Sequence, residues 1–139
     1  MQIKTLSFEV STRGHNDIID ITPKVENLLS ESGLLEGSAL VFAPGSTAGI
    51  TTIEYEPGLL KDYPQFMEKL IPSNVTYQHD ETWHDGNGFS HIRAALQGAS
   101  FTVPFSAGRL LLGTWQQIIL LDFDNRSRER KIIVQLMGQ

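Results

Sequence analysis

The sequence predicts one α+β domain over residues 1–139, with two packed layers made mostly of antiparallel strands and two to three helices. Short segments rich in β-branched and aromatic residues recur along the chain, and clusters of glycine, proline and asparagine separate them. These connections are too short for the crossovers that parallel strands need, so antiparallel pairing is favoured. A chain of 139 residues fits one domain with one sizeable hydrophobic core.

Alternating or β-branched patterns predict a series of extended segments. The first, residues 3–10, alternates polar and apolar side chains, as expected for a half-buried strand. The last two are long, and the turn at residues 124–127 is predicted to join them as a hairpin. The full set of expected strands is 3–10, 18–21, 38–43, 50–54, 75–77, 101–104, 113–123 and 129–137.

Helix signals are fewer. Thr22 is predicted to cap a helix that stops at Gly33, a residue type common just beyond a helix C-terminus. Asp62 is predicted to cap a second helix with an apolar face. Ser90 could cap a short third helix that runs through Leu96.

Composition argues against several classes of function. The formal net charge is −5, which disfavours a general nucleic-acid binder. The longest apolar run, residues 118–121, is far too short to cross a bilayer. The N-terminal segment alternates in character and lacks the features of a signal peptide, so we expect a cytoplasmic protein. There is no cysteine, so any metal must be held by His, Asp, Glu or water.

Basic residues gather near the C-terminus, between Arg126 and Lys131. This run could meet a phosphorylated small molecule. A solvated hairpin end is the favoured interpretation of this run.

A histidine-rich segment is the strongest candidate for chemistry. His79, His84 and His91 lie in the polar stretch 77–93, much of which is expected to be a loop. Neutral imidazole is the commonest metal ligand and a proton shuttle near neutral pH. If Ser90 caps a helix, His91 sits at the helix start, where its pKa would be lowered. The spacing of the histidines matches no standard metal motif, so hydrogen-bonded histidines in a rigid loop are an equal alternative.

Five other residues could contribute to a site. Ser46 and Thr47 lie in a Gly-rich segment that could cradle a phosphate, although it lacks the lysine of a P-loop. Arg109 could hold an anion or end a hairpin. Trp115 could stack on a heterocycle or fill a core or a subunit interface. Glu54 follows an apolar run and, from its neighbours alone, is expected to be the first exposed residue past a buried strand.

Three blocks of the sequence form a recognisable set. The first is Tyr77-x-His79, then Asn87-x-x-x-His91 and Leu96-x-Gly98. The second joins Gly108-Arg109-Leu110 to Leu112-Gly113-Thr114-Trp115-Gln116. The third is the closing Asp122-x-Asp124-x-Arg126-x-Arg128 with a final strand that ends at Gly138. Together they resemble the YjbQ-like protein family over nearly the whole chain, and the Gly-Thr-Trp-Gln block is the most specific part.

The resemblance implies an α+β fold that contains a β-sandwich and assembles as a homotrimer about a threefold axis. It also implies a site of histidines and a glutamate near a subunit boundary. Many relatives carry a histidine where this chain has Gly45, and one hypothesis is that His84 replaces that imidazole in space. Carried over residue by residue, the implied catalytic residues are Glu54, His79 and His91, with Asn87 beside them.

The family is associated with a secondary thiamine-phosphate synthase activity. The resemblance therefore implies transfer of a pyrimidine methylene group to a thiazole phosphate with loss of pyrophosphate, aided by a divalent metal such as Zn or Mg. Metal-assisted phosphoester hydrolysis and a non-catalytic trimer that binds a small molecule or anion are the alternatives. The expected metal ligands are His79, His84 and His91. The expected substrate-binding residues are Ser46, Thr47, His84, Asn87, Arg93, Arg109 and Trp115.

Overall fold

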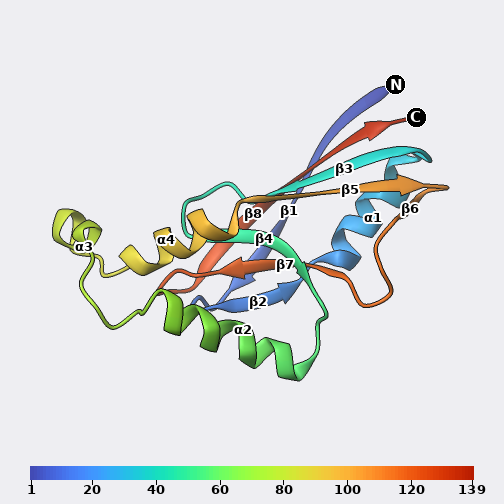
Figure 1. The fold of residues 1–139 in the computed structure, drawn as a ribbon. Helices are drawn as coiled ribbons and strands as arrows, with labels where there is room; N and C mark the ends of the chain where they lie inside the picture. Colours follow the sequence, from blue (N-terminus) through green and yellow to red (C-terminus); the bar gives the residue numbers. More distant parts are fainter.

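The computed structural model describes every residue from Met1 to Gln139 and shows two antiparallel sheets with four helices around them (Figure 1). One sheet has five strands in the order β1-β8-β3-β5-β6, and the other has three in the order β2-β7-β4. Along the chain the elements are β1 (Gln2–Thr12), β2 (Asp17–Asp20), α1 (Thr22–Ser32), β3 (Gly37–Phe42), β4 (Ala48–Ile53), α2 (Pro57–Leu70), α3 (Gln78–Trp83), α4 (Gly88–Gln97), β5 (Ser100–Ser106), β6 (Arg109–Leu110), β7 (Gln117–Asp122) and β8 (Arg128–Gly138).

The predicted α+β class and antiparallel pairing are confirmed. Every strand pair in both sheets is antiparallel. The number of helices is four rather than two to three, because α3 forms where a loop is predicted. None of these helices combines the length and hydrophobicity needed to cross a membrane.

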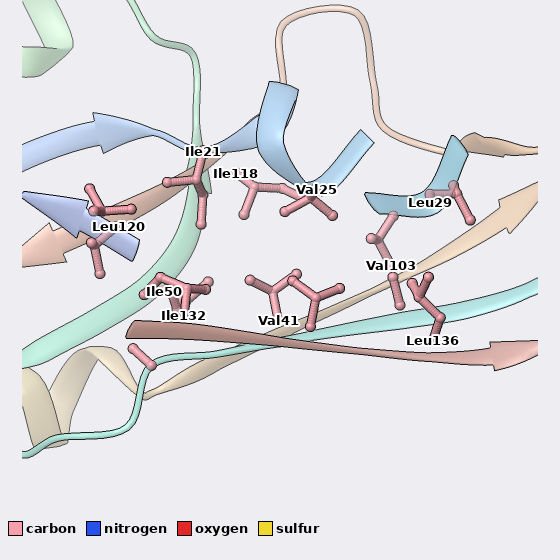
Figure 2. Close-up of a cluster of buried hydrophobic side chains, with 14 of the residues drawn as sticks. Ile21, Val25, Leu29, Val41, Ile50, Val103, Ile118, Leu120, Ile132 and Leu136 are labelled. Carbon is pink, nitrogen blue, oxygen red and sulfur yellow. The ribbon is translucent and has the colours of Figure 1, made fainter. Parts of the chain in front are cut away.

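The main hydrophobic core lies between the two sheets and beneath α1. Figure 2 shows side chains from α1, from β3, β5 and β8 of the larger sheet and from β4 and β7 of the smaller one meeting in this layer. Most are fully removed from water, and this burial is the main driving force for folding. The labelled residues are Ile21, Val25, Leu29, Val41, Ile50, Val103, Ile118, Leu120, Ile132 and Leu136.

A second, smaller core covers the other face of the three-stranded sheet. Met67 and Ile71 come from α2 and the residue after it, and Phe89 comes from α4. They pack on Ile119 and Leu121, which point away from the main core. Strand β7 is therefore buried on both faces, which explains why the sequence has an unbroken apolar run there instead of an alternating pattern.

The turn after β7 does not form the predicted hairpin. Strand β7 pairs with β2 and β4, whereas β8 pairs with β1 and β3 in the other sheet. The turn at residues 124–127 therefore carries the chain from one layer to the other. Strand β7 is also shorter than predicted, because residues 111–116 form a loop and turn.

Helices α1 and α2 begin at other positions than predicted. Helix α2 starts at Pro57, because the Glu56 carboxylate accepts hydrogen bonds from the N–H groups of Gly58 (2.8 Å) and Leu59 (2.6 Å). Thr22 does not cap α1 with its side chain, which instead accepts a hydrogen bond of 2.8 Å from the Ile118 N–H. The predicted end of α1 is confirmed, with Gly33 in the left-handed region at φ 74°.

Two further differences fall in the polar stretch that carries the histidines. Residues 75–77 form no strand, and residues 78–83 are helical. Helix α4 begins at Gly88, so Ser90 lies inside its first turn and does not cap it. The Ser90 hydroxyl donates to the Phe123 carbonyl (2.5 Å), which fixes α4 against the end of β7.

Candidate functional site

A polar cleft of about 400 Å³ lies where α3, α4, the segment before β4 and the start of β8 meet. Helices α3 and α4 contribute His79, Trp83 and His91, and the residues before α4 contribute Asp85 and Asn87. Only one of the lining residues is hydrophobic, so the cleft suits a polar ligand. The lining residues are Gly45, Ser46, Thr47, His79, Trp83, Asp85, Asn87, His91, Arg128 and Arg130.

Asp80 fixes the two histidine-bearing helices relative to each other. Its carboxylate accepts from the N–H of Tyr77 (2.9 Å), before α3, and from the N–H of Gly88 (2.8 Å), at the start of α4. These two N–H groups hold the pKa of Asp80 below its usual 3.8. A side chain at position 88 would bring its Cβ within 2.7 Å of the Tyr77 Cβ, so this approach requires glycine.

The imidazoles of His79 and His91 lie side by side, with ring centroids 4.2 Å apart and planes tilted by 47°. The Nε2 atom of His79 is buried and has no hydrogen-bond partner. The nearest carboxylate oxygen, Oδ1 of Asp85, is 3.6 Å away, beyond hydrogen-bond distance. The pair therefore includes one buried ring nitrogen, Nε2 of His79, that no protein group engages.

Burial lowers the pKa of His91 below its usual 6.5, and the neighbouring His79 lowers it further. Asp124, Asp85 and Asp80 oppose this shift without reversing it. The pKa of His91 is lowered, as predicted, but the main cause is burial and not a position at the helix start. His91 lies in the second half of the first turn, and its own N–H already points to the Asn87 carbonyl (3.4 Å). At neutral pH His91 is thus an imidazole that can accept a proton.

This shift predicts how stability depends on pH. A folded-state pKa below the unfolded value contributes stability that is complete above pH 6.5 and is lost as the pH falls through the folded value. We expect the free energy of unfolding to fall on acidification from about pH 7 to about pH 5, and to fall less in His91→Gln. Urea denaturation of both proteins across this range is the measurement. Parallel curves for the two proteins would contradict the assignment to His91.

The two arginines that line the cleft are each paired with a buried aspartate behind them, and we call these two ion pairs the floor of the cleft. Asp122, at the end of β7, accepts from Nε and Nη2 of Arg130 on β8, each at 2.8 Å. Asp122 is 0% exposed and Arg130 is 9% exposed. The hydroxyl of Thr47 accepts from the same Nη2 at 2.8 Å. This bidentate pair fixes the guanidinium plane at the base of the cleft.

Asp124 forms the second half of the floor. Burial favours its neutral form, but hydrogen bonds from Asn87 and from the N–H of Asn125, together with Arg128, outweigh burial and hold the pKa of Asp124 below its usual 3.8. The distances are 3.2 Å from the Asn87 amide and 2.6 Å from Nη2 of Arg128. Thr47 also donates to Asp124, at 3.1 Å. The carboxylate is therefore ionised at neutral pH and acts only as an acceptor.

These pairs determine how the cleft can attract an anion. Each arginine is matched by a buried aspartate, so the floor carries little net charge. Attraction for an anion must therefore come from individual N–H groups. One such group is Nη1 of Arg130, which makes no hydrogen bond within the protein. This atom faces Gly45, where a Cβ would lie only 3.2 Å from it. Glycine at position 45, with φ 130°, leaves Nη1 accessible from the cleft.

Several residues predicted for one site are spread over different parts of the molecule. His84 ends α3 with φ 58°, is exposed and does not line the histidine cleft. Glu54 and Trp115 line a separate open cleft on the edge of β4, and Trp115 is 70% exposed. Arg109 lies beside α1 in a third depression. Of the predicted set, His79, His91, Ser46, Thr47 and Asn87 share the cleft.

The prediction that Arg93 binds substrate is wrong for this fold. It is 1% exposed, and its guanidinium donates to the Ile71 carbonyl (2.6 Å), to Glu68 (2.8 Å) and to Asn16 (3.1 Å). These bonds tie α4 to the end of α2. Arg93 is therefore a structural residue on the side of α4 that faces the end of α2.

The predicted metal ligands do not converge within one chain. His79 and His91 are adjacent, but the chain has no group of three or more His, Asp or Glu residues placed to hold a metal ion. Two imidazoles are fewer than the three protein ligands that catalytic zinc sites use. The residues of a single chain therefore do not form a site for a resident metal. The expected binding of a metal by these histidines stays a prediction.

The arginines and aspartates of the floor were not predicted as site residues. The run from Arg126 to Lys131 was expected to be a solvated hairpin end, yet Arg130 is buried and Arg128 lines the cleft. A signal was present in the alternation of charges. Asp122 and Asp124 are two residues apart, as are Arg128 and Arg130, and in the extended β8 this spacing places both arginines on one face.

The fold and the cleft define a class of protein: an α+β protein with two sheets and a polar histidine cleft where the chain crosses between the sheets. Comparison with known proteins places the chain more closely. The family described as UPF0047 protein YjbQ-like matches residues 6–139, and the chain belongs to this family.

Relatives and solved structures agree with this assignment. The chain is 39% identical over 132 residues to a UPF0047 protein of Archaeoglobus fulgidus, covering 95% of this chain and 100% of that one. It is 37% identical over 138 residues to UPF0047 protein YugU of Bacillus subtilis, covering 98% and 99%. A hypothetical protein of Aeropyrum pernix superimposes with a TM-score of 0.91 at 34% identity, over 98% and 99% of the two chains. A YbjQ-like protein of unknown function from Sulfolobus solfataricus gives 0.89 at 30% identity, over 99% and 100%.

Proposed function

We propose that the histidine cleft binds a phosphorylated small molecule and catalyses a reaction of the thiamine-phosphate synthase type. In this reaction the thiazole nitrogen bonds to the pyrimidine methylene carbon, the bond from that carbon to the diphosphate oxygen breaks, and pyrophosphate leaves. The observation that carries the proposal is the pairing of two adjacent imidazoles with an unengaged guanidinium N–H group in one polar cleft. The type of reaction rests on the resemblance to the family.

The geometry supports a specific division of roles. Nη1 of Arg130 and the hydroxyl of Ser46 are the donors that face a phosphate, and the fixed guanidinium plane orients it. Such preorganised donors stabilise negative charge that develops on a leaving group. His91 is neutral at neutral pH, and its one ring N–H group can donate a hydrogen bond that stabilises departing pyrophosphate.

We further propose that the chain forms the homotrimer implied by the resemblance. Within one chain Glu54 and Trp115 lie in a cleft separate from the histidines. A neighbouring subunit that brought Glu54 to the histidine cleft would complete the expected set of catalytic residues. It would also cover the exposed indole of Trp115.

The test is formation of thiamine phosphate by the purified protein from the pyrimidine diphosphate and the thiazole phosphate. We expect product from the wild type and a loss of at least about 100-fold in His91→Asn, since losing one donor to developing negative charge costs about 100- to 1,000-fold. Light scattering on the same samples should give three times the chain mass.

Two histidines outside the cleft serve as controls. His15→Asn and His84→Asn each place asparagine, which tolerates positive φ, at positions with φ 56° and 58°. We expect both to retain activity, and loss in His84→Asn alone would restore the hypothesis that His84 replaces the histidine missing at Gly45. Phosphate binding without turnover would instead favour the non-catalytic binding protein, and a monomer in light scattering would contradict the trimer.

A further inference from the structure

Asn87 carries an unpaired acceptor inside the cleft. The residue is 5% exposed, and its Nδ2 donates to Oδ1 of Asp124 at 3.2 Å. Its Oδ1 is buried and has no hydrogen-bond partner in the protein. Buried acceptors of this kind are almost always paired, with protein or with an ordered molecule.

The orientation of this amide is fixed by its neighbour. Asp124 is an ionised carboxylate, so it can only accept hydrogen bonds. A flipped amide would place the Asn87 oxygen against the Asp124 oxygens and turn an attraction into a repulsion. The nitrogen must therefore face Asp124, and the oxygen must face away from Asp124, in a residue that lines the cleft.

Helix capping does not engage this oxygen either. Asn87 occupies the N-cap position of α4, where its side chain would ordinarily accept from an N–H group of the first turn. No such bond forms, and the N–H of Ser90 donates instead to the backbone carbonyl of Asn87 at 2.9 Å. The side chain is thus withheld from its usual structural role.

We propose that Asn87 reads a hydrogen-bond donor on the ligand, so that the cleft selects phosphorylated molecules that also carry an O–H or N–H group. The inference rests on the proposed phosphate site and adds a second recognition element to it. The nearby Nε2 of His79 is also unpaired, but an imidazole nitrogen can donate or accept, so it does not set the polarity of its partner. An amide oxygen can only accept a hydrogen bond, so the oxygen of Asn87 requires a donor on its partner.

Three phosphate esters of graded chemistry test this selection. Methyl phosphate offers a phosphate alone, 2-methoxyethyl phosphate adds an ether acceptor, and 2-hydroxyethyl phosphate adds a donor. At about pH 8 the ester phosphates are dianions without an O–H of their own, since their second pKa is about 6. Titration of each ester into the full-length protein, followed by NMR of the His79 and His91 imidazoles, reports binding at the cleft itself.

We expect the wild type to bind the hydroxyethyl ester about 5- to 10-fold more tightly than the methoxyethyl ester, as one hydrogen bond provides. In Asn87→Leu, which is similar in shape, this ratio should fall to about 1 while methyl phosphate still binds. Asp124 keeps its bonds from Thr47, Arg128 and the N–H of Asn125 in that variant.

The outcomes separate the two proposals. Equal binding of the two larger esters by the wild type, or an unchanged preference in Asn87→Leu, would overturn the inference and leave the phosphate site intact. Failure of the wild type to bind any of the three esters would contradict the phosphate site and the inference with it. The wild-type preference is decisive even if a variant does not fold.

Discussion

Replacing Asp122 with alanine is expected to destabilise the folded protein by about 3–5 kcal/mol, the usual cost of removing one partner of a buried ion pair. The carboxylate is 0% exposed and accepts two hydrogen bonds from Arg130. Its loss leaves a guanidinium that is 9% exposed without that partner. Asp124 lies 3.9 Å from the same guanidinium, which places the expected loss toward the lower end of the range.

Urea denaturation compares this variant with a matched surface change. Arg126→Ala alters an exposed arginine in the same turn that makes no salt bridge, so its effect should stay within about 0.5 kcal/mol. The double variant Asp122→Leu with Arg130→Met should recover much of the loss, because the pair is replaced by apolar groups. A loss below about 1 kcal/mol in Asp122→Ala would show that the pair does not support the crossing between the sheets.

The fold class could be predicted because it depends on local patterns. The alternation in β1 and the unbroken apolar run in β7 follow from how many faces of each strand are buried. Which sheet a strand joins depends on contacts far apart in the sequence. The turn after β7 looks the same locally whether it closes a hairpin or crosses between layers, and only the pairing of β8 with β1 and β3 decides.

The candidate site shows the same division between local and distant information. His79 and His91 could be identified from residue type, and the short α3 and α4 bring them together. The ion pair between Asp122 and Arg130 could not be identified in this way, since it forms only once the two sheets pack. Charged residues are almost never buried unless they are paired. The sequence does not reveal the pairing, so it favours solvent exposure for Arg130.

Arg93 and Arg109 illustrate how charge alone misleads. Both were predicted to contact phosphate, and the structure separates them by burial. Arg93 packs its guanidinium over the Phe89 ring at 4.9 Å, whereas Arg109 is exposed at the edge of the larger sheet. The environment of each arginine is set by α2 and β6, which the residues around it in the sequence do not reveal.

Arg93→Ala is expected to lower the free energy of unfolding by about 3 kcal/mol or more, through a cavity and an unpaired buried carbonyl. The ion pair with Glu68 contributes little of this, because the Glu68 side chain is 47% exposed. The larger share comes from two bonds to the Ile71 carbonyl, made by Nε at 3.1 Å and Nη2 at 2.6 Å. Lysine lacks this fork, so Arg93→Lys should recover only part of the loss.

Measuring stability and affinity on the same variants distinguishes this structural role from the predicted phosphate contact. Folded Arg93→Ala protein should bind methyl phosphate at the histidine cleft as the wild type does, while its unfolding midpoint in urea falls. Arg109→Ala should change neither quantity beyond about 0.5 kcal/mol, because Arg109 is exposed and makes no ion pair. A loss of phosphate affinity at unchanged stability in Arg93→Ala would mean that the guanidinium reaches the ligand after all, which its bonds to α2 exclude in this fold.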